Sequence, residues 1–305
     1  MRLGAVMRRA LSTVLAPALL TACLTACSNS TAGSSGSIDV VAGFYPLVFL
    51  AERIGGIHVT VKDLTPAGAE PHDIELTAHD VVKVREADLV LYLHGLAPAV
   101  DEAAGESKHA LDVAAVTDQV SGYSAIEEGE KSKDTGLDPH VWLDLQRMGA
   151  IATAVRDRLV AADAAHADDY RQNASTLAAE LFALDADFKT GLAHCARKDI
   201  VTSHNAFGYL ARRYGLTQVG ISGLVPDAEP APGRLAEVTD YARHNHVTTI
   251  YFESIVSPKV AQTVANSIGA RTAVLDPIES KPRGGDYLDG MRRNLAALRA
   301  GLGCG

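Results

Sequence analysis

The sequence is short of several features that mark common protein classes. It has a single Trp among 305 residues, and its 28 Lys and Arg are outnumbered by 37 Asp and Glu, with a pI of about 5.6. A domain that binds nucleic acid usually has a basic face, so this excess of acidic residues argues against a nucleic-acid partner. Neither HExxH nor GxSxG occurs, which removes the motifs of two large hydrolase classes.

The first 26 residues differ from the rest of the chain. Arg2, Arg8 and Arg9 precede an uncharged and mostly apolar stretch at residues 10–22. This stretch is too short for an ordinary membrane-spanning helix and is typical of a secretory signal. We therefore expect an exported protein.

Two consecutive copies of one pattern, LTAC, end this segment at Cys23 and Cys27. Leu, two small residues and Cys resemble a bacterial lipobox, in which the Cys becomes the lipidated N-terminus. Cys27 is the better candidate because the polar run at 28–37 follows it at once as a flexible tether. Cys23 and a plain secretory peptide remain as alternatives.

This assignment makes residues 1–26 a lipoprotein signal peptide and residues 27–37 a tether. The mature protein would lie outside the cytoplasm, anchored to the outer face of the cell membrane by its N-terminal lipid. Removal of the signal deletes three arginines and no acidic residue, so the net charge falls from −9 to −12.

Only Cys195 and Cys304 remain after the signal. Outside the cytosol, a lone pair of cysteines favours a disulfide, and no CxxC spacing suggests a structural zinc site. We expect a Cys195–Cys304 bridge that ties the C-terminal tail to the second half of the chain.

Short β-branched runs alternate with amphipathic stretches, the pattern of βα units around parallel sheets. We expect strands at residues 38–42, 59–64, 89–93, 200–202, 248–252 and 270–275. A helix over about residues 167–192 is long, and its apolar residues recur every three or four positions as one packed stripe.

These elements predict an α/β fold of two lobes joined by one long rigid helix. The N-terminal lobe would comprise residues 38–165, the linking helix 166–193 and the C-terminal lobe 194–305. Ligands of open α/β sheets collect beyond the carboxyl ends of the strands. We therefore expect the ligand site in the cleft between the lobes.

Four possible metal ligands lie in loops that could face this cleft, and three of them follow predicted strands. His204 and Asp276 come just after strands of the second lobe, His72 lies in the loop after strand 59–64, and His140 lies in the turn that ends an acidic loop. Three imidazoles and one carboxylate form a closed set of the kind that zinc accepts, whereas Ca²⁺ and Mg²⁺ prefer oxygen ligands. Because such binding needs neutral imidazoles, affinity should fall below about pH 6.5.

Several stretches resemble the zinc and manganese solute-binding proteins of bacterial ABC importers, the high-affinity zinc-uptake family. They are FYPL (44–47), EPHDIELT (70–77), DPHVWLDL (138–145), SHNAFGYLARRYGL (203–216), SPKVAQTVA (257–265), LDPIE (275–279) and DYLDGMRRNLAAL (286–298). The resemblance implies metal ligands at His72, His140, His204 and Asp276, no enzymatic activity, and delivery of the ion to an ABC permease and its ATPase. We expect a monomer.

The bound ion is better assigned as Zn²⁺ than as Mn²⁺. Zinc-specific members often have a His-rich loop, and here residues 126–136 contain no histidine. Manganese members, however, commonly have Glu where this chain has His204. Imidazole is also the donor that zinc prefers.

Alternatives remain for the ligands and for the function. His94 also follows a strand directly, and Glu253 ends a strand of the second lobe, so either could assist the site. Trp142 is expected to pack in the core. A secreted zinc hydrolase is one rival function, although the apparent fourth ligand leaves no open position for water. A metal-binding adhesin or buffer that is not coupled to transport is another.

Overall fold

The computed structural model describes residues 37–120, 137–226 and 230–305. The signal peptide, all but the last residue of the tether, Cys23, Cys27 and the loop 126–136 lie outside the described residues. The described residues all belong to one compact unit. In that part of the chain, no helix is long and apolar enough to cross a membrane.

The first lobe is built on a parallel sheet with strand order β2-β1-β3-β4. Its strands are β1 (Ile38–Ala42), β2 (Val59–Asp63), β3 (Leu89–Tyr92) and β4 (Ala110–Asp112). Its helices are α1 (Tyr45–Gly55), α2 (Ala78–Glu86), α3 (Pro98–Gly105) and α4 (Leu145–Ala162), with short 3₁₀ turns at Gly56–His58, Val113–Val116, Val141–Leu143 and Ala164–His166. Alternate side chains pack on opposite faces of the sheet: Val40 and Leu91 face the cluster that contains α1 and α4, and Val41 and Val90 face α2 and α3.

The second lobe repeats this plan with strand order β6-β5-β7-β8, again all parallel. Its strands are β5 (Asp199–Thr202), β6 (Thr217–Gly220), β7 (Thr249–Phe252) and β8 (Arg271–Val274). Its helices are α6 (Gly208–Tyr214), α7 (Pro232–His244), α8 (Lys259–Ile268) and α9 (Tyr287–Leu302). Val201 and Ile250 pack against α7 and α8, whereas Ile200 and Tyr251 join the core shared with the first lobe.

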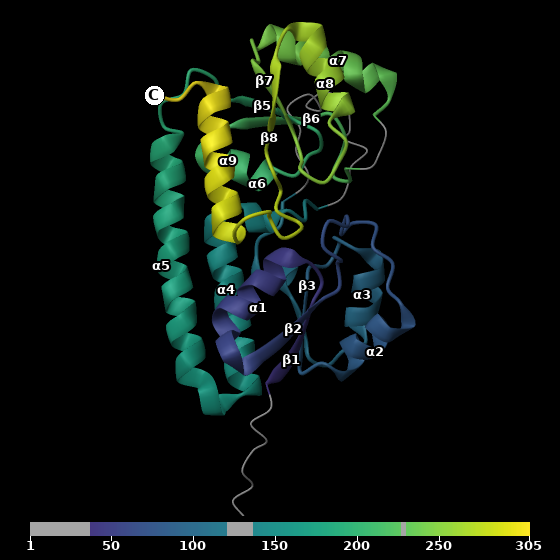
Figure 1. Ribbon diagram of the computed structural model, residues 1–305, viewed down its shortest axis with the longest axis vertical. Coiled ribbons are helices and arrows are strands. Elements are labelled where there is room, and N and C mark those ends of the chain that lie inside the picture. Colours follow the sequence, from purple (N-terminus) through teal and green to yellow (C-terminus); the bar gives the residue numbers. More distant parts are fainter. Residues whose placement is uncertain (1–36, 121–136, 227–229) are drawn as a thin grey trace, which may run out of the picture. The chain divides into compact units, whose positions relative to one another are not determined.

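The long helix α5 (Ala167–Gly191) contacts α1 and α4 of the first lobe and α9 of the second (Figure 1). Its predicted apolar stripe is buried, with Leu177, Leu181, Leu184 and Phe188 in one hydrophobic cluster that also contains residues of both lobes. The predicted fold of two α/β lobes with a long linking helix is confirmed.

The expected strands omit β4 and β6. β4 has only three residues, all half-buried, and β6 has the sequence TQVG, in which Gln and Gly interrupt the apolar run. Each is an edge strand of its sheet. Such short segments have too few apolar residues to indicate a strand on their own.

Two further predictions are confirmed. Trp142 is 1% exposed, and its indole Nε1 donates a hydrogen bond to the Pro277 carbonyl oxygen at 2.7 Å, so it joins the two lobes as well as filling the core. Cys195 and Cys304 form a disulfide. Backbone bonds from Ala196 N to Gly303 O and from Arg197 N to Leu302 O pair the C-terminal residues with the segment that follows α5.

Candidate metal site

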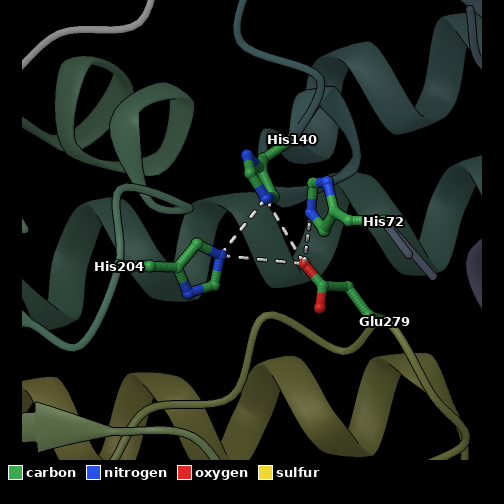
Figure 2. Close-up of side chains that lie close together, drawn as sticks. All are labelled: His72, His140, His204 and Glu279. Carbon is green, nitrogen blue, oxygen red and sulfur yellow. Dashed lines mark hydrogen bonds and ion pairs between the residues drawn. The ribbon is translucent and has the colours of Figure 1, made fainter. Parts of the chain in front are cut away.

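Four buried side chains meet where loops of the two lobes face each other (Figure 2). His72 lies in the loop between β2 and α2, and His140 immediately precedes the 3₁₀ turn Val141–Leu143. His204 follows β5 by two residues, and Glu279 lies between β8 and α9. Three of the four positions therefore follow a strand at the carboxyl end of a parallel sheet, where ligands of such folds collect.

The donor atoms of these residues are spaced as the corners of one coordination polyhedron. Each residue offers one atom, and all four atoms lie within 4.8 Å of one another. Oε1 of Glu279 lies 3.3 Å from His140 Nε2, 3.6 Å from His72 Nε2 and 3.9 Å from His204 Nε2. The Nε2 atoms of His140 and His204 are 3.4 Å apart. A tetrahedral zinc ion with bonds of about 2.0–2.1 Å has edges of about 3.3–3.4 Å, so the set fits zinc.

Burial makes this arrangement costly without a cation. His72 is 6% exposed, and His140, His204 and Glu279 are each 0–1% exposed. Among the described residues, His72 Nε2 and both carboxylate oxygens of Glu279 are buried without a hydrogen-bond partner. Buried polar atoms normally have partners, and a buried carboxylate needs a compensating charge. A metal ion would supply that charge and satisfy His72 Nε2 and Glu279.

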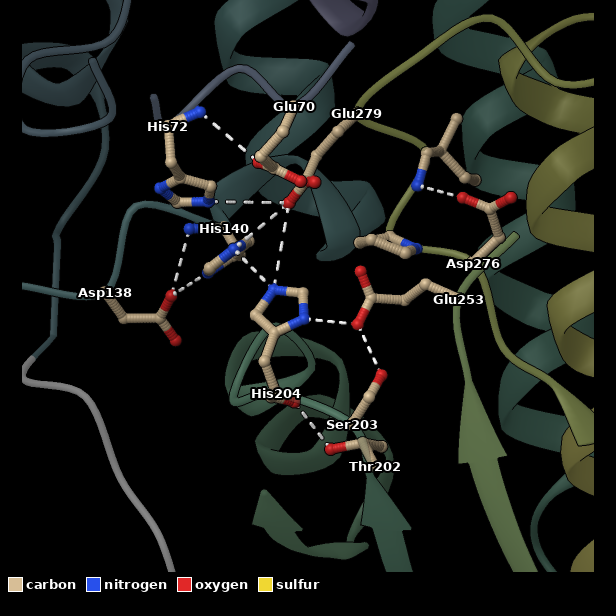
Figure 3. Close-up of polar contacts among 12 residues, drawn as sticks. Glu70, His72, Asp138, His140, Thr202, Ser203, His204, Glu253, Asp276 and Glu279 are labelled. Carbon is tan, nitrogen blue, oxygen red and sulfur yellow. Dashed lines mark hydrogen bonds and ion pairs between the residues drawn. The ribbon is translucent and has the colours of Figure 1, made fainter. Parts of the chain in front are cut away.

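Two more carboxylates lie behind the imidazoles (Figure 3). Asp138 Oδ1 accepts a hydrogen bond from His140 Nδ1 at 2.8 Å, and Glu253 Oε1 accepts one from His204 Nδ1 at 2.5 Å. Asp138 Oδ1 also accepts from the backbone N–H of His140. A proton held on Nδ1 leaves the Nε2 lone pair directed at the centre of the group. The carboxylate also makes the imidazole more basic and therefore a stronger metal ligand.

Burial and the neighbouring charges shift the pKa values of three of these four groups. Burial lowers the pKa of His72, because the charged imidazolium is poorly solvated there. Burial also lowers that of His140, but its hydrogen bond to Asp138 and the nearby Glu279 outweigh this and raise the pKa to about 9. Burial disfavours the Glu279 carboxylate, yet contacts with His140 and His72 lower its pKa well below its usual range. Without metal, a proton on His140 therefore compensates the buried carboxylates.

Asp276, the fourth ligand expected from the sequence, lies outside this group of four residues. Its carboxylate is not part of the four-residue group: Oδ2 accepts a hydrogen bond from Ser254 Oγ at 2.5 Å, and Oδ1 accepts one from the backbone N–H of Ile278 at 2.8 Å (Figure 3). The bond to Asp276 spans two residues, and Ile278 takes a left-handed φ of 62°. The residue after this turn, Glu279, points at the histidines.

This difference has a simple origin. The carboxyl-end rule favours the first polar residue after a strand, and Asp276 occupies that position near the end of β8. The turn at Ile278 is unusual for a β-branched residue and could not be inferred from the sequence pattern. The signal that could have found Glu279 was its presence in the LDPIE stretch at 275–279.

Of the two residues that could assist the site, Glu253 contacts it and His94 does not. His94 lies outside the group; its side chain is 68% exposed and its Nδ1 is 3.2 Å from Asp101 Oδ2. Glu253 contacts the site through His204 and also accepts a hydrogen bond from Ser203 Oγ at 2.5 Å. The structure thus brings His72, His140 and His204 together with Glu279, supports His204 through Glu253, and leaves His94 and Asp276 apart.

Residues 40–301 match the model of one protein family, described as "Zinc-uptake complex component A periplasmic". The chain is 35% identical over 297 residues to the high-affinity zinc uptake system protein ZnuA of Bacillus subtilis, which covers 90% of this chain and 92% of that protein. It is also 35% identical over 281 residues to the zinc-binding lipoprotein AdcA of Streptococcus pneumoniae, which covers 87% of this chain. The chain spans only 56% of the length of that streptococcal relative.

Solved structures are similar over the same range. The laminin-binding protein Lmb of Streptococcus agalactiae is described as a bifunctional protein with adhesin and metal-transporting activity. It has a TM-score of 0.79 and 31% identity, and the match covers 87% of this chain and 99% of that one. The Zn(II)-bound ZnuA-like domain of AdcA from Streptococcus pneumoniae has a TM-score of 0.72 and 34% identity, with 88% and 99% covered.

Proposed function

The chain belongs to the zinc-uptake complex component A family, and from that premise we propose that it captures Zn²⁺ outside the cytoplasm and delivers it to an ABC permease driven by its ATPase. The observation that carries this proposal is the group of three imidazole Nε2 atoms and Glu279 Oε1, in which the three distances from Glu279 Oε1 and the His140–His204 distance are 3.3–3.9 Å. We propose His72, His140, His204 and Glu279 as the ligands.

The donor set supports zinc over manganese. Three neutral imidazoles and one carboxylate suit a borderline-soft ion with four ligands, whereas Mn²⁺ prefers more oxygen donors. Three carboxylates, those of Glu279, Asp138 and Glu253, surround the three imidazoles and favour a divalent cation. A ligand set drawn from both lobes also links binding to the way the lobes contact each other.

The same geometry argues against the hydrolase alternative. A catalytic zinc ion usually keeps one position open for water, and here four protein donors are available for a tetrahedral shell. The four side chains are also at most 6% exposed among the described residues, which disfavours contact between the ion and a large substrate. We therefore propose a carrier of the ion rather than an enzyme.

Elemental analysis of protein purified without added metal tests this function. The expected result is about one zinc per chain, because one group of ligands is present in the described residues. Competition should then show zinc displacing manganese, with an excess of manganese failing to displace zinc. A protein that binds manganese more tightly, or that binds no metal at pH 7.5, would contradict the proposal.

Membrane anchoring through Cys27 is a separate proposal, supported by the lipobox pattern and by relatives named as lipoproteins. Cys27→Ser with Cys23 intact should release the protein from the membrane fraction, and Cys23→Ser is the matched control. Retention of the Cys27 variant with release of the Cys23 variant would reverse the assignment. We also propose that the anchored protein acts as a monomer.

The adhesin alternative stays a prediction. It rests on similarity to the laminin-binding protein Lmb, which is described as having both adhesin and metal-transporting activity. Because both activities are ascribed to that protein, adhesion would add to zinc capture rather than replace it. Binding of the purified protein to immobilised laminin, with and without zinc, would measure it directly.

A further inference from the structure

Helix α6 of the second lobe begins at a glycine that lies against Asp138, the carboxylate behind His140. A methyl group at Gly208 would lie 2.7 Å from Asp138 Oδ2. Real Cβ atoms do not approach other atoms that closely, and the site is buried, with Gly208 and Asp138 both in the interior. The close approach therefore requires glycine at this position.

Asp138 has little freedom to move away. Its Oδ1 accepts hydrogen bonds from both the backbone N–H of His140 at 3.0 Å and the imidazole Nδ1 at 2.8 Å (Figure 3). A shift or rotation of the carboxylate that relieved a contact at Oδ2 would lengthen both bonds at Oδ1. It would also release the imidazole from the orientation that directs Nε2 at Glu279.

The next residue of α6 holds the main chain of Asp138. The phenol of Tyr209 donates a hydrogen bond to the Asp138 carbonyl oxygen at 3.0 Å and accepts one from Val120 N at 3.0 Å. The guanidinium of Arg147 lies 5.0 Å from the centre of the Tyr209 ring. Two consecutive residues of the second lobe thus contact Asp138, one at its side chain and one at its backbone.

We infer that Gly208 is a positioning residue for metal binding: it lets α6 close onto Asp138 and so fixes the imidazole of His140. This inference rests on the proposed function. His204 lies four residues before Gly208 on the same segment. This segment of the second lobe therefore supplies one proposed ligand, His204, and orients another, His140 of the first lobe. Contact between the lobes is therefore part of building the site.

The test is zinc affinity of Gly208→Ala, measured by competition with a chelator. We expect a loss of roughly 10- to 100-fold, the usual effect of disturbing the group behind a ligating histidine. Gly233→Ala is the matched control, because Gly233 is an exposed residue in the first turn of α7 and a methyl group there meets nothing within 4 Å. Its affinity should stay within about twofold of the wild type.

A double-mutant cycle separates positioning from a general structural effect. In an Asp138→Ala background the carboxylate that the added methyl group would strike is gone, so Gly208→Ala should cause little further loss. An equal loss in both backgrounds would overturn the inference. If Gly208→Ala does not fold, Tyr209→Phe replaces it, with an expected loss of about fivefold from the missing hydrogen bond to the Asp138 carbonyl oxygen, and an affinity equal to that of the wild type would overturn the inference.

The outcomes also distinguish the inference from the proposed function. A wild-type protein that binds no zinc would defeat the function itself. A wild-type protein that binds zinc tightly, with Gly208→Ala no weaker than Gly233→Ala, would leave the function intact and overturn only the role of Gly208.

Discussion

The two lobes share one sheet plan but supply the site differently. Counted along each lobe, the strand order is the same, β2-β1-β3-β4 in the first lobe and β6-β5-β7-β8 in the second. The first lobe places His72 after its second strand and His140 after its fourth, whereas the second lobe places His204 after its first strand and Glu279 after its fourth. The shared plan fixes the edge at which ligands gather, and the loops decide which residue reaches the centre.

The lobes also differ in charge at the centre. The first lobe contributes two imidazoles, and the second contributes one imidazole and the only carboxylate of the four-residue group. Behind them the lobes are matched, with Asp138 supporting His140 and Glu253 supporting His204. Loss of a ligand from either lobe should therefore weaken binding, but loss of Glu279 should act mainly through charge.

The largest expected effect comes from removing single imidazoles. Ala variants at His72, His140 and His204 should each lose on the order of 100-fold or more in zinc affinity. Loss of a residue that supports a ligand costs about 10- to 100-fold, and loss of the ligand itself should cost more. His94→Ala is the control from the first lobe, since that side chain is exposed and outside the group. Competitive zinc titration measures all four. A loss at His94 equal to the others would show that the ligand set is wrong.

The next largest expected effect is the difference in zinc affinity between variants of Glu279 and of Asp276, two carboxylates of the second lobe. Glu279→Gln should weaken zinc binding by roughly 10- to 100-fold, because it removes the negative charge that touches the ion. Asp276→Asn should change affinity by less than about threefold, because an amide can still accept the Ile278 N–H bond and contact Ser254. The reverse ranking of these two variants would restore Asp276 as the ligand.

These contrasts show how far the sequence alone could lead. Alternation of strands and helices predicted both lobes. Positions after strands indicated His72 and His204, because topology places those positions at one edge of a sheet, and His140 was expected in the turn that ends an acidic loop. The position of Glu279, the proposed fourth ligand, depends on the backbone before it. Ile278 has a left-handed φ and donates its N–H to Asp276. The Asp138–Gly208 contact depended on packing between residues 70 positions apart. Neither leaves a periodic signal.

A smaller effect is expected from pH. The pKa of His140 in the metal-free protein is about 9, so at pH 7 this imidazole carries a proton that zinc must displace. Raising the pH removes the competing proton, so affinity should increase about tenfold per pH unit between 7 and 9 and then level off. Burial lowers the pKa of His72, so protonation of this imidazole should add to the fall only below its ordinary range.

Zinc titrations at pH 6, 7, 8 and 9, corrected for the chelator, would measure this slope. Calorimetry in buffers of different ionisation enthalpy would count the protons released on binding. An Asp138→Asn variant should lower the pKa of His140 and flatten the dependence above pH 7, because Asp138 is the strongest contributor to the raised value. An affinity that is constant from pH 7 to 9 in the wild type would contradict a protonated His140.

The coordination of the bound ion is the most direct test of the central claim that both lobes hold one zinc through three imidazoles and Glu279. X-ray absorption at the zinc edge should be measured on the stoichiometric complex of the wild type and of Glu279→Gln. The account predicts a four-coordinate shell of three nitrogens and one oxygen at about 2.0–2.1 Å, with an altered shell in the variant. A six-coordinate shell dominated by oxygen, or a shell unchanged by Glu279→Gln, would contradict it.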